Sequence, residues 1–303
     1  MAKITIPDAL KADVPPTMWG RILTATPVIM TVVATALAGL ASSEMTRAQY
    51  SRSLAAQLQS KAGDQWGFFQ AKRLRSAIQR NALDILQNTA DVHPLDTAVL
   101  NQAGVAPDSP AGQQSLAALQ KGQLPPFAVA PLTDPHMKAA LDAIEDQKLD
   151  AEVAALLAPV SNQTIAEALR VARDRARAFD AAVQPINQAV DQLEKSLAGA
   201  EKSLTRDIAA ARLRYTGARY DAEARLNQAI ANLYELQVRK SNTEAERHHR
   251  RSQKFFFGML AAQAAVIIST FSLAARKRSL LWSLAAAAGA GAISFAVYVY
   301  LFV

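Results

Sequence analysis

Residues 186–222 read INQAVDQLEKSLAGAEKSLTRDIAAARLRYTGARYDA, and this stretch decides the fold. Apolar or small residues recur in it, mostly at steps of three and four, and such spacing is typical of a helix that packs lengthwise on another helix. After Lys254 an uncharged apolar run, residues 255–275, follows without a break. We therefore expect one helix from Ile186 to Ala275 that begins in water and ends in a membrane. The recurring residues are Ile186, Val190, Leu193, Leu197, Ala200, Leu204, Ile208, Ala211, Tyr215, Ala218 and Ala222.

The composition favours long helices over a compact core that contains a sheet. The 303 residues are rich in alanine, 6% aromatic and include only 12 glycines, which suits helices. Cysteine is absent, so disulfides, thiolate zinc sites and a thiol nucleophile are excluded.

The positive charge is concentrated beside the apolar runs. The formal net charge is +7, and basic residues next to a membrane span usually anchor it at anionic headgroups. Nucleic-acid binding is the weaker alternative, because it would require basic residues interleaved with aromatics. The expected anchors are Arg247, Arg250, Arg251, Lys254, Arg276, Lys277 and Arg278.

Three segments are long and apolar enough to cross a bilayer, which takes about 20 residues. They are residues 22–43, 255–275 and 280–303, and none contains an ionisable side chain other than tyrosine. The basic turn at 276–278 joins the last two into an antiparallel hairpin. We interpret the first as an uncleaved anchor, with a cleaved signal peptide as the alternative.

Residues 44–91 predict a second long helix with its own apolar stripe, which ends before His93-Pro94. The stripe comprises Leu54, Leu58, Ala62, Trp66, Phe69, Leu74, Ile78, Ala82 and Ile85. Two helices that leave and re-enter one membrane face can run antiparallel, each covering the other's stripe.

Residues 92–185 are rich in proline and contain short helical patterns around 113–120, 136–146 and 150–157. We expect a small helical cap at the far end of the antiparallel pair. Thr164-x-x-Glu167 has the form of a capping box before an amphipathic run, and Pro185 should kink or break that run.

The predicted fold class is an all-α membrane protein: three transmembrane helices, a long antiparallel helical (coiled-coil-like) stalk and a small helical cap. The expected segments are a polar leader at 1–21, transmembrane helices at 22–43, 255–275 and 280–303, stalk helices at 44–91 and 186–254, and the cap at 92–185.

No pattern indicates catalysis. The chain lacks the glycine-rich phosphate loops, the H-E-x-x-H zinc motif and the G-x-S-x-G nucleophile motif. His248 and His249 are adjacent on a helix and point about 100° apart, so they cannot grip one ion together. The pairs Asp221/Glu223 and Glu244/Glu246 are interpreted as solvated helix faces. We expect no enzyme activity, no cofactor, no metal and no nucleic-acid partner.

Residues 64–72, DQWGFFQAK, are unusual in this alanine-rich chain because they combine three aromatics with two amides and opposite charges. Two interpretations stay open, packing against the long helix and recognition of a second subunit or a partner. Gly63 and Gly67, one turn apart, would let another backbone approach closely. The residues concerned are Asp64, Gln65, Trp66, Phe68, Phe69, Gln70 and Lys72.

This stretch resembles the D-Q-W-x-[YF]-[YF]-Q-A-K signature of an uncharacterised bacterial membrane protein family, domain of unknown function 4337. The resemblance extends over about 20–91 and 200–303, including Arg247-His248-His249-Arg250 and Trp282. Residues 92–199 look like an insertion. Because the family has no assigned activity, the resemblance supports the topology and implies no reaction.

The positive-inside rule orients the chain. The basic turn at 276–278 should stay in the cytoplasm, which puts residues 42–254 in the periplasm of a bacterial inner membrane. The basic flank at 239–254 argues the other way, but long domains translocate largely regardless of charge.

Two functions are compatible with this architecture. The first is a membrane-anchored scaffold or interaction protein that forms a homo-oligomer, with the lipid bilayer and an unknown protein at the cap as partners. The second is an oligomeric channel, mechanosensitive or otherwise, because Thr24, Thr31 and Thr35 lie near one face of the first span.

Overall fold

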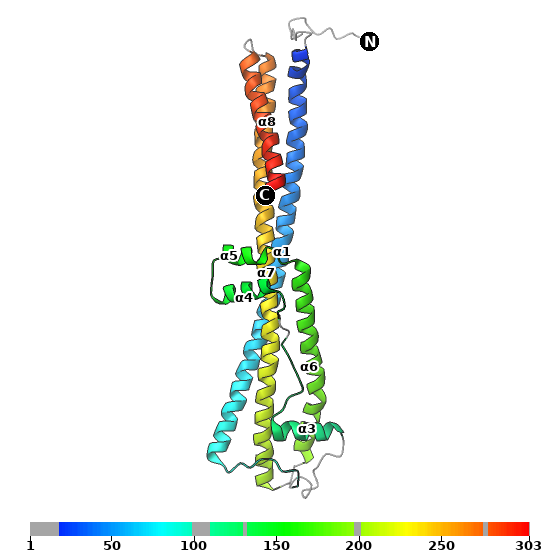
Figure 1. Cartoon of the computed structure of the whole chain (residues 1–303), viewed down its shortest axis with the longest axis vertical. Coiled ribbons are helices and arrows are strands. Elements are labelled where there is room, and N and C mark those ends of the chain that lie inside the picture. Colours follow the sequence, from blue (N-terminus) through cyan, green and yellow to red (C-terminus); the bar gives the residue numbers. More distant parts are fainter. Residues whose placement is uncertain (1–17, 99–109, 130–131, 197–200, 275–277, 303) are drawn as a thin grey trace, which may run out of the picture. The chain divides into compact units, whose positions relative to one another are not determined.

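The structure is a computed structural model that describes residues 18–98, 110–129, 132–196, 201–274 and 278–302. Within these ranges the chain is helical and contains no strand (Figure 1). The all-helical fold class is therefore confirmed. The helices are α1 (Met18–Thr89), α3 (Pro110–Lys121), α4 (Pro135–Glu145), α5 (Asp150–Leu157), α6 (Asn162–Ser196), α7 (Lys202–Ala274) and α8 (Arg278–Phe302).

The chain divides into two compact units. Unit 1 comprises Met1–Leu54 with Ser241–Val303, and unit 2 comprises Ala55–Lys240. The helices α1 and α7 each contribute one part to unit 1 and another part to unit 2.

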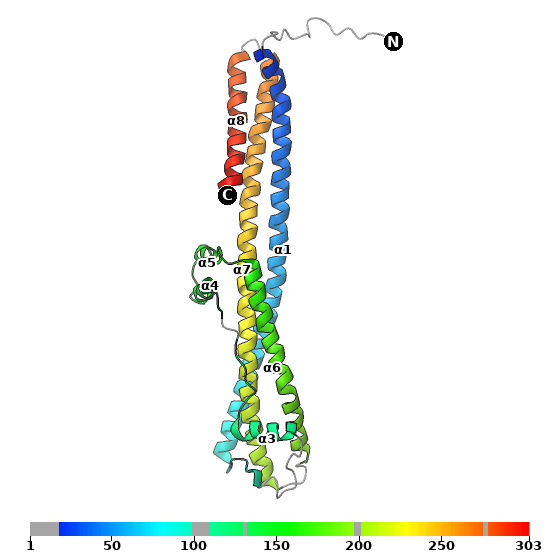
Figure 2. The ribbon, with the colours of Figure 1, turned by 45° about the vertical axis from the view of Figure 1, so that its right-hand side comes forward.

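Unit 1 holds the three candidate membrane spans, in α1, α7 and α8 (Figure 2). The helix α7 runs antiparallel to α1, since the Ser252 hydroxyl donates a 2.7 Å hydrogen bond to the carbonyl of Ala41. The helix α8 returns antiparallel to α7, which brings the Lys254 ammonium 5.6 Å from the Tyr298 ring centre. Three such helices indicate a multi-pass membrane protein, as predicted.

Small residues let the spans of unit 1 approach closely. A Cβ atom on Gly258 would lie 3.4 Å from Leu37, and one on Gly289 would lie 2.5 Å from the sulfur of Met30. Gly39 and Gly291, the other two glycines of these spans, have open space instead. The apolar core of this unit is formed by Ala34, Leu37, Ala41, Phe255, Ala262, Ala292 and Val299.

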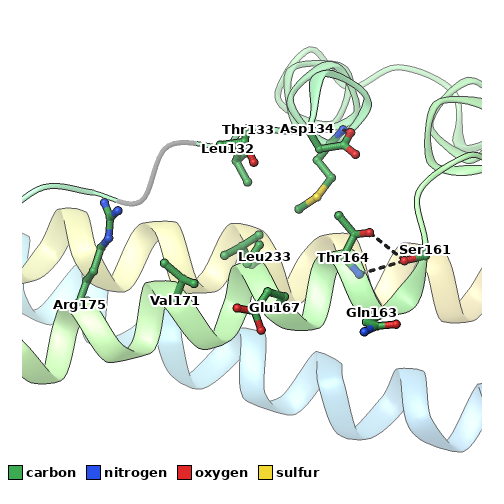
Figure 3. A pocket seen from close by; sticks show the side chains of 12 residues that line it. Leu132, Thr133, Asp134, Ser161, Gln163, Thr164, Glu167, Val171, Arg175 and Leu233 are labelled. Carbon is green, nitrogen blue, oxygen red and sulfur yellow. Dashed lines mark hydrogen bonds between the residues drawn. The ribbon is translucent and has the colours of Figure 1, made fainter.

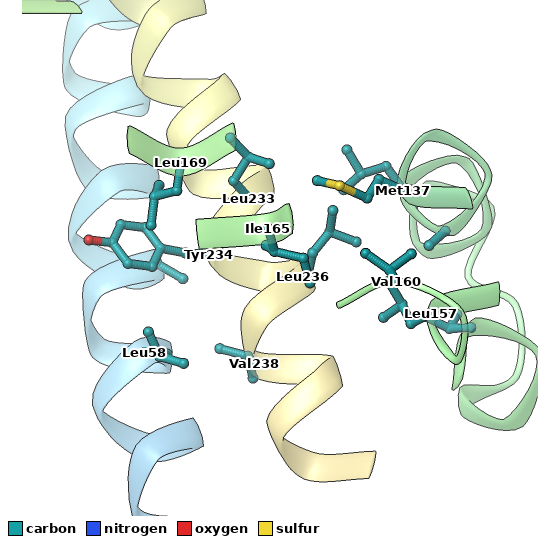
Figure 4. Close-up of a cluster of buried hydrophobic side chains, with 14 of the residues drawn as sticks. Leu58, Met137, Leu157, Val160, Ile165, Leu169, Leu233, Tyr234, Leu236 and Val238 are labelled. Atoms are coloured by element: carbon teal, nitrogen blue, oxygen red, sulfur yellow. The ribbon is translucent and has the colours of Figure 1, made fainter. Parts of the chain in front are cut away.

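The helix α7 is the centre of unit 2, because residues from α1, α4, α5 and α6 share one core with it (Figure 4). From Ile230 to Val238 it buries apolar side chains on several sides, including Leu236 with 0% of its surface exposed. The neighbours come from α1 (Leu58, Ala62), α4 (Met137, Ala140, Leu141, Ala143), α5 (Val153, Leu157) and α6 (Ile165, Leu169, Ala172).

A second core of unit 2 joins α3, α6 and the first turns of α7. Its α6 residues are Ile186, Val190 and Leu193, and its α7 residues are Leu204, Ile208, Ala211 and Tyr215. The two helices run antiparallel, since the Tyr215 hydroxyl donates to Asn187 at 3.2 Å and Arg212 donates to Asp191 at 3.1 Å. The residues of the predicted stripe therefore lie on two helices, α6 and α7, that pack against each other.

The expectation of one helix from Ile186 to Ala275 is wrong. Pro185 lies inside α6, which continues to Ser196, and α7 begins at Lys202. A proline inside a helix costs about 3 kcal/mol, but burial of Val183 and Ile186 on either side of it compensates. The boundary predicted at 185/186 therefore lies between Ser196 and Lys202.

The short helices α3, α4 and α5 were predicted correctly, but they do not form one cap at the far end. The pair α4 and α5 packs on Leu233 and Leu236 of α7, whereas α3 packs on α6 in the second core. The capping box is also wrong, because the Ser161 hydroxyl accepts the backbone N–H of Thr164 at 3.0 Å. Glu167 instead bonds to Arg170.

The stripe predicted on residues 44–91 faces α7 only in part. Leu58 and Ala62 are buried in unit 2, and Trp66 and Phe69 are half-buried. Beyond Phe69 the covered side of α1 begins with the polar residues Lys72 and Ser76 and continues with the half-buried Leu83 and Leu86. As a result Leu74, Ile78 and Ile85 are 63%, 53% and 55% exposed.

The first core can be tested by truncating its centre. Leu236→Ala should lower the free energy of unfolding by about 2–5 kcal/mol, because it leaves a cavity among four helices. Leu149→Ala, at a leucine 73% exposed in the same unit, should leave thermal unfolding in detergent nearly unchanged. Equal shifts for the two variants would contradict the packing described.

Candidate functional site

The stretch 64–72 lies on α1 in unit 2, and the structure divides it between two sides of the helix. Gln65, Trp66, Phe69 and Lys72 are half-buried, whereas Asp64, Phe68 and Gln70 are exposed. The rings of Trp66 and Phe69 meet edge to face at 5.4 Å. The packing interpretation therefore accounts for four of these residues and leaves the other three open to solvent.

Lys72 ties this stretch to α7. Its ammonium forms an ion pair with Glu223 and lies 5.1 Å from the ring centre of Tyr220. The Nε of Arg219 lies 3.5 Å from the same carboxylate. Glu223 thus neutralises one cation from each helix in a place that is mostly shielded from water.

A second carboxylate, Asp221, collects three arginines. Arg73 donates to it at 3.0 Å, Arg225 lies at 2.9 Å and Arg80 at 3.8 Å. Asp221 is buried, so the expectation that Asp221 and Glu223 form a solvated face is wrong. The sequence periodicity could not reveal this, because Lys72, Arg73 and Arg80 come from a helix about 150 residues away.

The two helices approach each other closely beside these charges. The Ser76 hydroxyl donates a 2.9 Å hydrogen bond to the carbonyl of Gly217. A Cβ atom on Gly217 would lie 3.5 Å from Gln79 and 3.7 Å from the carbonyl oxygen of Ser76. We call the set Lys72, Arg73, Ser76, Gly217, Asp221 and Glu223 the polar joint.

A small cavity of about 200 Å³ adjoins the polar joint. Asp180 of α6 lines it together with Lys72, Glu223 and Asn227. Partial burial, and after it the nearby Glu223 charge, raises the pKa of Asp180, while Lys72 and Arg219 oppose the shift. Burial also raises the pKa of Tyr215 to about 12. The polar joint is a structural network of ion pairs, and the Asp180 carboxylate beside it lies where its charged form is disfavoured.

A larger cavity of about 530 Å³ lies between the start of α4, the first half of α6 and Leu233 (Figure 3). Its charged side chains Asp134, Glu167 and Arg175 are engaged with neighbouring residues. The Asp134 carboxylate accepts the backbone N–H groups of His136 and Met137, and Glu167 is held by Arg170. Arg175 donates to the carbonyls of Ala128 and Val129. No nucleophile–base pair is assembled there.

The basic flank of unit 1, residues 247–254, directly precedes the apolar run of α7. Arg247 and Arg250 are exposed, and Arg251 and Lys254 are half-buried. His248 Nδ1 lies 2.6 Å from Glu44 of α1, a contact that spacing did not suggest. Arg276 and Lys277 lie outside the described residues, and Arg278 is the first residue of α8.

The threonines proposed to line a pore are exposed on α1. The hydroxyls of Thr31 and Thr35 bond to the carbonyls of Pro27 and Thr31, one turn back, at 2.8 and 2.9 Å. A hydroxyl satisfied within its own helix can face lipid. These contacts therefore give no support to a pore. Among the described residues no three His, Asp or Glu side chains converge on a metal position.

Comparison with known proteins identifies the part of the chain that contains nearly all of α1 and its aromatic stretch. Residues 19–110 match the family model described as domain of unknown function (DUF4337). The DUF4337 match includes the first span and Asp64–Lys72, as the sequence resemblance predicted. It does not include residues 200–303, for which the resemblance stays a prediction. No curated protein and no solved structure matches the chain.

The polar joint predicts a charge-specific loss of stability. Glu223→Gln should cost about 1–3 kcal/mol, because it leaves Lys72 and Arg219 without their counter-charge in a shielded place. The matched control is Glu167→Gln, which removes an exposed partner of Arg170 and should leave thermal unfolding unchanged. A Glu223→Gln variant as stable as the wild type would contradict the role given to the joint.

Asp180 predicts a pH dependence of the opposite sign to the usual carboxylate. Because its pKa is raised in the folded chain, the group favours folding when protonated, and that contribution is lost as pH rises through the folded pKa. Asp180→Asn should therefore raise the melting temperature at pH 7 and have little effect near pH 3. A melting temperature lowered at pH 7 would show that Asp180 stabilises the joint.

Proposed function

We propose that this protein is a membrane-anchored helical scaffold that assembles with further copies of itself and carries out no reaction. The single observation that carries the proposal is the exposed apolar side of α1 in unit 2. Leu74, Ile78 and Ile85 are all more than half exposed there. Monomeric soluble surfaces rarely expose apolar residues in a continuous row, and such rows mark interaction sites.

Burial of these three side chains against a second copy would favour assembly. Fully burying a leucine or isoleucine side chain contributes about 1.5–3 kcal/mol. Two copies that cover each other's Leu74, Ile78 and Ile85 would gain on the order of 5–9 kcal/mol before the cost of association. Membrane anchoring lowers that cost, because it confines the copies to one surface and raises their effective concentration.

We infer the lack of an enzymatic role from the sequence and from the charged residues of unit 2. Asp221 and Glu223 serve the joint between α1 and α7 and are not free for acid–base work. The charged side chains around the larger cavity, Asp134, Glu167 and Arg175, are bonded to neighbouring residues.

The placement we propose is the inner membrane of a bacterium, with unit 2 in the periplasm. It is supported by the basic turn at 276–278 and the positive-inside rule. The basic residues Arg247, Arg250, Arg251 and Lys254 would then contact anionic headgroups on the outer side of the bilayer.

The proposal is tested by the mass of the wild-type protein, measured by light scattering in detergent and by native mass spectrometry from nanodiscs. The expected result is an integral multiple of the 32.5 kDa chain that persists on dilution of the detergent-solubilised protein. A single chain under all of these conditions would reject self-assembly.

A further inference from the structure

We propose that the exposed side of α1 in unit 2 is a parallel, in-register seam that packs against the same residues of a second copy. This inference rests on the proposed self-assembly and specifies which surface makes it and in which register. We call the surface the α1 seam. It comprises Gly67, Ala71, Leu74, Ile78, Asn81, Ile85 and Asn88, all of which are exposed.

The spacing of the seam is that of a coiled coil. Ala71, Ile78 and Ile85 recur every seven residues, and Leu74 with Asn81 and Asn88 forms a second row offset by three. The first row is apolar throughout and the second combines one leucine with two asparagines, and two rows at this spacing describe a surface that fits another helix lengthwise. A globular partner or a lipid surface would not require a repeat of seven.

The seam is available because the rest of the chain occupies the opposite side of α1. Lys72 and Ser76 face α7 through the polar joint. At about 100° per residue these positions lie roughly opposite Leu74 and Ile78. The helix therefore has two separate stripes: one is paired with α7, and the other has no partner among the residues that the structure describes.

The electrostatics around the seam favour an identical copy. Arg73 and Arg80 are drawn to Asp221, and the Arg75 guanidinium lies 5.8 Å from the ring centre of Tyr220. The cations nearest the seam are thus held against α7. Two copies can therefore approach along the seam while Arg73 and Arg80 are drawn toward Asp221 of α7.

The direction of the seam follows from the membrane. The N-terminal part of α1 carries the first candidate span, so copies in one bilayer enter it through the same end of the helix. Equivalent residues then face each other across a two-fold axis. Gly67 has no atom within 4 Å of the position a Cβ would take, which leaves room for the two backbones to approach.

The polar positions of the seam set its register. Asn81 lies between Ile78 and Ile85 in the row of Leu74. An asparagine inside an apolar seam is best satisfied by the same residue of the second helix, and this selects one register and a low copy number. The register places Ile78 opposite Ile78.

The absence of cysteine allows a direct test with single-cysteine variants of the full chain in membranes. Ile78→Cys and Leu74→Cys should form disulfide-linked dimers on mild oxidation, since the bond needs Cβ atoms about 4 Å apart. Gln87→Cys, exposed on another side of α1, is the matched control and should cross-link at least fivefold less. Equal yields at positions 78 and 87 would overturn the seam.

Register is tested by co-expressing differently tagged Ile78→Cys and Ile85→Cys chains. Homodimers should exceed the mixed dimer several-fold, and an excess of mixed dimer would overturn the in-register arrangement. The mass measurement separates the two proposals. An oligomer whose seam cysteines fail to cross-link rejects the seam and leaves the scaffold standing, whereas a monomer rejects both.

Discussion

The polar joint between α1 and α7 is the constraint on which unit 2 depends. Lys72 and Arg73 lie next to each other on α1, and Glu223 and Asp221 lie two residues apart on α7. Charges in a shielded place are tolerated only when they are paired, so this contact admits few registers between the two helices. The Ser76–Gly217 hydrogen bond selects the same register without charge, because glycine lets the backbones approach.

This choice of register determines what the apolar residues can do. Once Lys72 and Ser76 face α7, the isoleucines and leucine of the other stripe must face away from it. The apolar side chains of the central helix α7 are buried against α6 and the α4–α5 pair. Unit 2 is therefore well packed around α7 and incomplete along α1, which is the property expected of a subunit rather than of a self-sufficient domain.

Much of the fold was readable from local patterns. The three spans, the end of α1 before His93-Pro94 and the helices α3, α4 and α5 follow from hydropathy, proline positions and short helical runs. Two errors have a common cause. Apolar residues at steps of three and four identify the buried stripe of a helix but not the helix that it packs against. The pattern therefore predicts one helix across Ile186–Leu193 and Leu204–Tyr215, whereas in the structure these two segments pack on each other. The same ambiguity hid the exposure of Leu74, Ile78 and Ile85.

The sequence alone determined that this chain is helical, carries three segments long and apolar enough to cross a membrane and contains the aromatic stretch of a DUF4337 domain, because hydropathy, helix propensity and motif spacing are local properties. Only the tertiary structure decided that the buried Asp221 and the half-buried Glu223 form ion pairs, that Pro185 lies within α6 and that Leu74, Ile78 and Ile85 of α1 are exposed. Each of these depends on which residues distant in sequence come together. Such contacts stabilise two helices together, so the sequence pattern of either helix alone does not reveal them.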